Sequence, residues 1–205
     1  EFLEKKNGIL AMATGSGKTW TSFKIMNELF KDNLISQVII TMNGNPLLAQ
    51  WLDVLYEDYK AHDKGRIIFK HFGGEAGGWD LEGFLNNPTG NLLMITNDKL
   101  SDALTKIDEQ EASKTLIIYD EAHNLGSETR RNKTSKLHEK FKYRLGLTAT
   151  PDRLFDEEGT KFLKDEIGPV IFEFTLEQAI ERGILVEFDY DALKYNLSDD
   201  ENKKI

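Results

Sequence analysis

A short stretch with two glycines, a lysine and a threonine lies near the start of the chain, at residues 13–19. Its sequence is Ala-Thr-Gly-Ser-Gly-Lys-Thr. It follows the apolar run 8–10 and precedes a segment, 20–30, whose apolar residues recur at helical spacing. Gly15 and Gly17 permit backbone conformations that are closed to other residues, so successive amide groups can surround a phosphate. The spacing therefore predicts a phosphate-binding loop, called the phosphate loop below, between a strand and a helix.

The residues of the phosphate loop can divide the binding of a nucleoside triphosphate among them. Lys18 would place a compact cation on the outer phosphates, and the Thr19 hydroxyl would bind the magnesium ion that accompanies them. Such loops usually begin with a glycine where this chain has Met12, and the alternative is a glycine turn of an unrelated α/β protein. The residues expected to bind the nucleotide are Thr14, Gly15, Ser16, Gly17, Lys18 and Thr19.

Two adjacent carboxylates, Asp120 and Glu121, follow the apolar run 115–119. That run is typical of a buried strand, and ligands bind at the carboxyl ends of the strands in open α/β sheets. Because adjacent strand residues point to opposite sides, the two carboxylates can take different tasks. We expect Asp120 to bind magnesium, usually through water, and Glu121 to position and polarise the attacking water. A bare Asp-Glu pair is otherwise a solvated surface pair; the strand and the phosphate loop favour the catalytic interpretation.

Apolar strands alternate with helical segments along most of the chain. This alternation predicts an α/β fold, a doubly wound and mainly parallel sheet with helices on both faces, as in P-loop NTPases. We expect one domain over residues 1–167 and an extension toward a second domain over residues 168–205. The further strands are expected at residues 36–41, 66–70, 91–96, 115–119 and 143–147.

The composition is ordinary for a globular protein: 205 residues, 40% hydrophobic and 30% charged. The chain has no cysteine, which excludes disulfides and suits the cytoplasm, or the nucleus in a eukaryote. No apolar run is long enough for a membrane span. A net charge of −9 argues against a surface that holds nucleic acid by bulk electrostatics, although it permits a local contact strip. The chain starts at Glu1 and ends in a polar run, and we expect it to be a fragment.

Three motifs in order, at residues 13–19, 120–123 and 147–153, resemble those of the first motor domain of superfamily 2 helicases and translocases. The second motif reads Asp-Glu-Ala-His and the third Leu-Thr-Ala-Thr-Pro-Asp-Arg. The most similar group contains the motor subunits of type III and type I restriction enzymes and the DNA-repair helicases of the transcription-factor complex. The resemblance implies a RecA-like domain of DEAH type with ATP and Mg²⁺ as cofactors. It also implies that three residues couple the nucleotide state to movement: His123, Thr148 and Thr150.

The resemblance further implies a nucleic-acid partner, expected to be double-stranded DNA. Four residues fall where such motors contact the phosphate backbone of their track: Asn43, Gly44, Thr96 and Asn97. Residues 43–46 depart from the more usual Pro-Thr sequence of that contact, but short polar side chains and backbone amides can grip phosphates without a large positive charge.

The implied function is an ATP-dependent helicase or translocase that acts in restriction, antiviral defence or DNA repair. The other expected partners are a second RecA-like domain and nuclease, methyltransferase or repair-complex subunits, with no membrane. Because the second domain would supply an arginine, the chain alone is expected to hydrolyse ATP weakly or not at all. The alternative is an ATP-dependent switch or scaffold subunit without strand-separating activity.

Other residues that could take part in chemistry have structural interpretations. Trp20 and Trp51 are expected in the hydrophobic core rather than as platforms for bases. His138 has no metal-ligand spacing and is expected at the surface. Residues 130–133 (Arg-Arg-Asn-Lys) form either a backbone-contacting patch or a solvated loop, and a helix is expected in the second half of residues 127–140.

Overall fold

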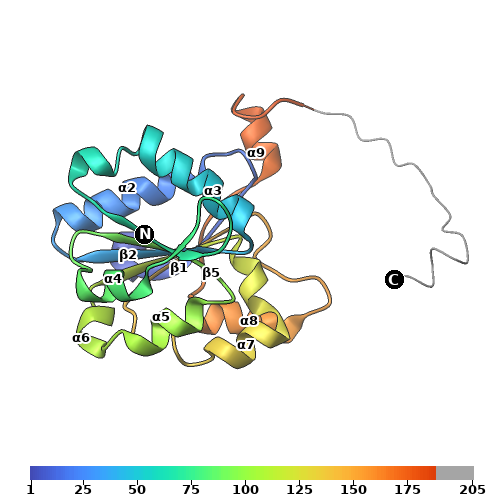
Figure 1. Ribbon diagram of the computed structural model, residues 1–205. Coiled ribbons are helices and arrows are strands. Elements are labelled where there is room, and N and C mark those ends of the chain that lie inside the picture. The colour runs from blue at the N-terminus through green and yellow to red at the C-terminus, as the bar shows by residue number, and fades with distance from the viewer. Residues whose placement is uncertain (188–205) are drawn as a thin grey trace, which may run out of the picture.

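The computed structural model describes residues 1–187, which form an eight-stranded sheet with helices on both faces (Figure 1). The strand order is β4-β3-β5-β2-β6-β7-β1-β8, and neighbouring strands run parallel except β3 and β4. The strands are β1 (Asn7–Met12), β2 (Gln37–Met42), β3 (Ile68–Phe72), β4 (Gly78–Trp79), β5 (Leu92–Thr96), β6 (Thr115–Asp120), β7 (Tyr143–Thr148) and β8 (Val170–Phe174). This mainly parallel, doubly wound arrangement confirms the predicted fold class.

The central strands are buried on both faces, as their near-continuous apolar sequences predict. In β2, Val38 and Ile40 face one hydrophobic core and Ile39 faces the other, because successive side chains point to opposite sides of a sheet. In β6, Ile118 belongs to the first core and Tyr119 to the second. This alternation decides which helical layer each residue at the end of β6 meets.

One helical layer packs against the first core. Its elements are α1 (Phe2–Lys5), α2 (Lys18–Lys31), α3 (Asn45–Asp53), a π-helical turn η1 (Val54–Asp58) and α9 (Leu176–Glu181). Helix α2 buries Phe23, Met26 and Leu29, which recur at the three-residue spacing of one helix face. Trp51 of α3 is 5% exposed and lies in the core as predicted. Trp20, in the first turn of α2, is 51% exposed, so its predicted place in the core is wrong.

The other helical layer packs against the second core. Its elements are α4 (Leu81–Asn86), α5 (Leu100–Lys106), α6 (Glu109–Ala112), a 3₁₀-helix η3 (Ala122–Gly126), α7 (Glu128–Thr134) and α8 (Glu157–Glu166). A 3₁₀ turn, η2 (His62–Lys64), precedes β3. Helix α7 occupies the first half of residues 127–140, so the helix predicted in the second half is wrong. That half turns through a positive φ of 64° at Lys136 and buries His138 completely, which contradicts its predicted surface position.

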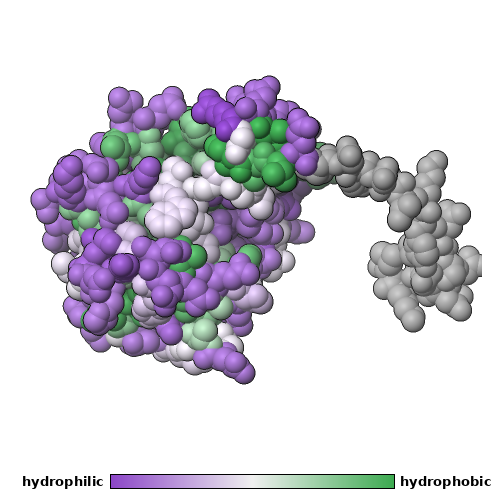
Figure 2. All heavy atoms as spheres, turned by 90° about the horizontal axis from the view of Figure 1, so that it is seen from above, coloured by the Kyte–Doolittle hydropathy of each residue, from purple (hydrophilic) through white to green (hydrophobic). Residues whose placement is uncertain are grey.

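The last described elements extend the sheet at the β1 edge, and the segment after them lies against the phosphate loop. Strand β8 pairs with β1 at the sheet edge, and Thr175 and Gln178 form a capping box at the start of α9. Figure 2 shows a mostly hydrophilic face with an apolar patch. Ile184 and Val186, close to the last described residue, are exposed. A side chain at Gly15 would contact Leu185 at 3.2 Å, so the segment after α9 lies against the phosphate loop.

The predicted boundary at residue 168 stays a prediction, and residues 188–205 of the second segment lie outside the described residues. No described helix combines the length and the apolar character that crossing a bilayer requires.

Candidate nucleotide and nucleic-acid site

The phosphate loop joins β1 to α2 at the carboxyl edge of the sheet. Gly15 has a φ of 81° and Gly17 a φ of 96°, so both glycines use backbone conformations that other residues rarely adopt, as expected from the sequence. Both the backbone N–H and the hydroxyl of Ser16 donate to the Ala13 carbonyl, at 3.2 and 2.6 Å, which tightens the turn. Met12, where a glycine is usual, is the last residue of β1 and is 5% exposed. Its φ is not positive, so this position does not require glycine.

Lys18 is the first residue of α2, directly after Gly17. Its ammonium donates to the carbonyls of Met12 at 3.2 Å and Ala13 at 3.5 Å, so the cation is folded back over the loop. The backbone amides of the first helical turn lack partners within the helix and carry its positive dipole end. The loop therefore combines a cation, a helix N-terminus and a glycine-dependent turn within one short segment. These are the features of a phosphate-binding site.

The two carboxylates of the Asp-Glu pair differ in backbone conformation and in partners. Asp120 ends β6, and its Oδ2 accepts a hydrogen bond of 2.8 Å from Trp51 Nε1. Its Oδ1 accepts one of 3.0 Å from the Glu121 backbone N–H. Glu121 has a φ of 46°, a left-handed conformation that is uncommon outside glycine, asparagine and aspartate. This strained residue turns the chain out of β6, and such strain is often found at functional sites.

A cavity of about 330 Å³ brings the two motifs together. Five of the residues predicted to bind the nucleotide line it: Thr14, Gly15, Gly17, Lys18 and Thr19. Trp20, Val54, Asp58, Asp120 and Glu121 line it as well. The residues that a magnesium ion would need are both present, since Mg²⁺ prefers oxygen ligands and is usually held by one or two carboxylates with phosphates and water. The Thr19 hydroxyl and the Asp120 carboxylate are thus the donor set that fits the ion.

The three predicted coupling residues form a chain of contacts with Glu121. His123 Nδ1 lies 3.0 Å from Thr148 Oγ1 and 3.4 Å from Glu121 Oε2. Thr148 is fully buried at the end of β7, and its Oγ1 accepts from the Thr150 backbone N–H at 3.1 Å. The structure therefore connects the carboxylate that faces the cavity to the segment after β7 through two side chains.

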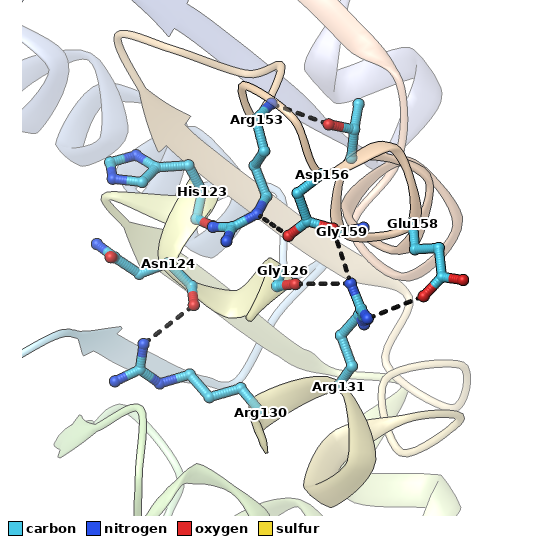
Figure 3. Close-up of polar contacts among 10 residues, drawn as sticks. His123, Asn124, Gly126, Arg130, Arg131, Arg153, Asp156, Glu158 and Gly159 are labelled. Carbon is cyan, nitrogen blue, oxygen red and sulfur yellow. Dashed lines mark hydrogen bonds and ion pairs between the residues drawn. The ribbon is translucent and has the colours of Figure 1, made fainter. Parts of the chain in front are cut away.

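A network of charged residues supports this connection (Figure 3). The Arg153 guanidinium donates to the His123 carbonyl, and its Nε donates to Asp156 Oδ2 at 2.7 Å. Asp156 also accepts from Arg131 at 3.1 Å, and Arg131 donates to the Gly126 carbonyl at 3.1 Å. The hydrogen bond from Arg153 is the main reason that the pKa of Asp156 lies below its ordinary value. The network fixes the segment after β6 to the segment after β7.

The four predicted nucleic-acid residues come from the ends of adjacent strands. Met42 of β2 pairs with Thr96 of β5, and the Asn97 backbone N–H donates to the Met42 carbonyl at 3.0 Å. Asn97 is 3% exposed and accepts from the Thr41 hydroxyl at 2.8 Å, so its side chain holds the two strand ends together. Asn43 is exposed beside it, and the half-buried Gly44 follows.

Arg130 of α7 reaches this group of residues. Its guanidinium donates to Asn43 Oδ1 at 2.8 Å and to the Asn124 carbonyl at 3.0 Å, and it lies 3.4 Å from Asp98. The Arg130 and Arg131 side chains are only 16% and 17% exposed, so the solvated-loop interpretation does not describe these two arginines. Sequence reasoning missed the contacts of Arg130 with Asn43 and Asp98, because these partners lie 87 and 32 residues away along the chain and no spacing indicates them.

The fold and the cavity define the class of this protein: an α/β P-loop NTPase with a RecA-like sheet. The family model described as "Type III restriction enzyme, res subunit" matches residues 2–153. The chain belongs to this family, and it has the fold and motif order of the first motor domain of superfamily 2 helicases.

Two curated relatives match nearly the whole chain. It is 30% identical over 206 residues to the DNA 3'-5' translocase XPB2 of Sulfurisphaera tokodaii, a match that covers 99% of this chain and 40% of the relative. It is 27% identical over 190 residues to the type I restriction enzyme EcoAI endonuclease subunit of Escherichia coli, with 88% and 20% covered. The chain thus spans two fifths or less of the length of these relatives.

A solved structure shares the fold. The ATP-dependent type ISP restriction-modification enzyme LlaBIII bound to DNA superposes with a TM-score of 0.62 at 23% identity. The match covers 89% of this chain and 15% of that one. At this identity the likeness concerns the fold.

Proposed function

We propose that this chain is the ATP-binding motor domain of an ATP-driven DNA translocase or helicase. One observation carries the proposal: the contact chain from Glu121 through His123 and Thr148 to the Thr150 backbone, which starts at the nucleotide cavity and ends outside it. A simple nucleotide-binding enzyme has no need of such a connection. The family membership and the names of the relatives, a DNA translocase and a restriction subunit, support it.

In this proposal the chain binds ATP with Mg²⁺ in the cavity between the phosphate loop and the Asp-Glu pair. Lys18 would leave its two carbonyl partners to bind the outer phosphates, and Thr19 and Asp120 would hold the metal ion, Asp120 through water. Bound Mg²⁺ supplies charge neutralisation on the phosphates. Glu121 orients the attacking water, because phosphoryl transfer depends mostly on alignment and charge stabilisation.

The coupling step uses the hydrogen bonds that surround His123. When the outer phosphate is lost, the partners of Glu121 change, and His123 transmits the change to Thr148 and then to Thr150. The Arg153 guanidinium holds the His123 carbonyl, so the histidine can shift its ring without displacing its backbone. Such a discrete rearrangement is how a small change at one site becomes a domain movement.

The proposed track is double-stranded DNA, held at the ends of β2 and β5. Asn43, Gly44 and Thr96 would contact phosphates, and the buried Asn97, which accepts a hydrogen bond from Thr41, would support the two strand ends. Arg130, which lies 3.4 Å from Asp98, would bring a guanidinium to this surface. The net charge of −9 does not exclude such a contact strip, because short polar side chains and backbone amides can also contact phosphates.

A second RecA-like domain is the proposed main partner. It would close over the nucleotide and supply an arginine, a contribution worth about a thousandfold or more in rate. Nuclease, methyltransferase or repair-complex subunits are proposed further partners, since two of the matched proteins are restriction enzymes.

The test is ATP hydrolysis by a protein that contains this chain joined to its second motor domain, with and without double-stranded DNA, single-stranded DNA and RNA. We expect stimulation by double-stranded DNA, and we expect Glu121→Gln to lower the stimulated rate by about a hundredfold or more. Glu28→Gln, on the exposed face of α2, is the matched control and should leave the rate unchanged. Hydrolysis that ignores every nucleic acid would refute the motor and favour the ATP-dependent switch or scaffold.

A further inference from the structure

Trp51 is buried in the core, but its indole N–H binds a carboxylate at the carboxyl edge of the sheet. It is 5% exposed, and its indole Nε1 donates a 2.8 Å hydrogen bond to Oδ2 of Asp120, 69 residues away along the chain. An indole has a single hydrogen-bond donor, so Trp51 makes this one hydrogen bond, to Asp120. The bond exists because Asp120 follows Ile118 by two positions and therefore lies on the face of the sheet that α3 covers.

The ring of Trp51 is fixed by aromatic neighbours. Phe23 of α2 meets it edge to face, with ring centroids 5.7 Å apart at 88°, and Phe23 in turn packs against Tyr59 at 4.8 Å. The Tyr59 hydroxyl donates to Asn27 Oδ1 at 2.7 Å, which ties the cluster back to α2. Helix α2 begins at Lys18, so the cluster relates the position of the indole N–H to the phosphate loop.

The chain directly after Trp51 also faces the nucleotide cavity. The π-helical turn η1 follows α3, and Val54 and Asp58 of this turn line the cavity that Asp120 and Glu121 line. Single π-helical turns cost regular hydrogen bonding and are often found at functional sites. Trp51 thus lies where α3, the cavity wall and the end of β6 meet.

Both oxygens of Asp120 are held by donors, one by Trp51 and the other by the Glu121 N–H. A carboxylate has about four lone-pair sites, so each oxygen keeps capacity for a metal-bound water after accepting one hydrogen bond. Two fixed donors leave the carboxylate a single orientation. Partners of this kind orient metal ligands, and their loss typically costs ten- to a hundredfold in metal affinity.

We propose that Trp51 is a positioning residue for the metal ion: its indole N–H fixes Asp120 in the orientation that receives the Mg²⁺ of the bound nucleotide. The inference rests on the proposed function, because it requires that ATP and Mg²⁺ bind at this cavity. It goes beyond that function in assigning a role in metal binding to a residue of α3, outside the nucleotide motifs.

The test uses Trp51→Phe in the 205-residue chain, because phenylalanine keeps an aromatic ring against Phe23 and removes the N–H. The measurement is the affinity for a fluorescent non-hydrolysable ATP analogue, first in EDTA and then across a Mg²⁺ titration. We expect equal affinity in EDTA and about a tenfold rise in the Mg²⁺ concentration for half-maximal effect. Trp79→Phe, at a 65% exposed tryptophan on β4, is the matched control and should match the wild type.

A double-variant cycle separates positioning from general damage. In an Asp120→Ala background the acceptor is gone, so Trp51→Phe should produce no further change in the Mg²⁺ dependence. A Mg²⁺ dependence of Trp51→Phe that superimposes on the wild type would overturn the inference. So would equal weakening with and without Mg²⁺, or a full additional effect in the Asp120→Ala background. If the wild-type chain binds the analogue in neither condition, the proposed function itself fails, and that result differs from each of the others.

Discussion

Burial of His138 predicts a specific loss of stability in mild acid. The residue is fully buried in the turn after α7, with its Nδ1 2.7 Å from the Tyr119 hydroxyl. Its Nε2 is buried without a hydrogen-bond partner among the described residues. Arg144 lies close, donating to the His138 carbonyl at 3.1 Å, and Glu166 of α8 lies in the same region. Burial, and secondly the Arg144 charge, lower the pKa of His138 from 6.5 to about 3.

The sign follows from the lowered pKa. Below pH 6.5 the unfolded chain binds a proton at His138, whereas the folded chain does not. The stability that the neutral His138 contributes is therefore fully present above pH 6.5 and is lost as the pH falls toward about 3. Each pH unit in this window costs about 1.4 kcal/mol, which makes about 2 kcal/mol between pH 7 and pH 5. Glu166 acts in the opposite direction, because burial raises its pKa and the folded state then binds more protons. Its contribution cancels when two variants that both retain it are compared.

The assay is urea unfolding of the wild type and of His138→Gln at pH 7 and pH 5. A neutral amide cannot take the proton, so the wild type should lose about 2 kcal/mol more than the variant over this interval. His62→Gln, at an exposed histidine, is the control and should follow the wild type. Only the change with pH is compared, so a lower absolute stability of His138→Gln does not matter. Parallel stability–pH curves for wild type and His138→Gln would refute the reasoning.

Three further predictions concern the site. Gly17→Ala should lower the affinity for an ATP analogue about tenfold in fluorescence titrations, because a φ of 96° is strained for alanine. Gly90→Ala introduces similar strain at a φ of 81°, also with open space around the new Cβ, and should leave the affinity unchanged. Equal affinities of the two variants would contradict the assignment of the phosphate loop. Gly126→Ala should lower the free energy of unfolding by about 1–3 kcal/mol, because its Cβ would lie 2.5 Å from Arg153 Cδ. An unchanged melting temperature in thermal unfolding would show that Arg153 can move aside without loss of stability. Arg130→Ala should weaken binding of a DNA duplex in anisotropy measurements and reduce the salt slope by about one; an unchanged slope would remove Arg130 from the DNA surface.

The strands and the glycine loop could be predicted from the sequence because local pattern decides them. Central strands of a parallel sheet are buried on both faces, so their apolar runs predicted β2, β5, β6 and β7 to within one or two residues. The conformations of Gly15 and Gly17 followed from the lack of a Cβ. The sequence also predicted that Asp120 and Glu121 lie beside the phosphate loop, because the carboxyl ends of parallel strands meet at one edge of the sheet.

Side-chain environments could not be predicted, because neighbours that are distant in sequence decide them. Trp20 shares the spacing of the core face of α2, but α2 starts at the sheet edge, and its first turn stands over the phosphate loop instead of the core. His138 is buried by Tyr119 of β6 and Phe162 of α8, whose rings lie 5.5 and 6.4 Å away. The helical spacing correctly placed Trp51 in the core, yet its hydrogen bond to Asp120 depends on the register between α3 and β6, which no local pattern encodes.

Helix α3 connects the two proposed activities of the domain because it is attached at both ends. Just before its start, Asn43 accepts from Arg130, which also donates to the Asn124 carbonyl behind the Asp-Glu pair. Near its end, Trp51 donates to Asp120. The nine residues of the helix span about 14 Å. A phosphate that draws Asn43 toward the track would therefore pull on the indole that orients the metal-binding carboxylate. The same displacement would loosen the Arg130 contact, so DNA at the ends of β2 and β5 would reach the nucleotide cavity by two routes, neither of which requires a strongly basic surface.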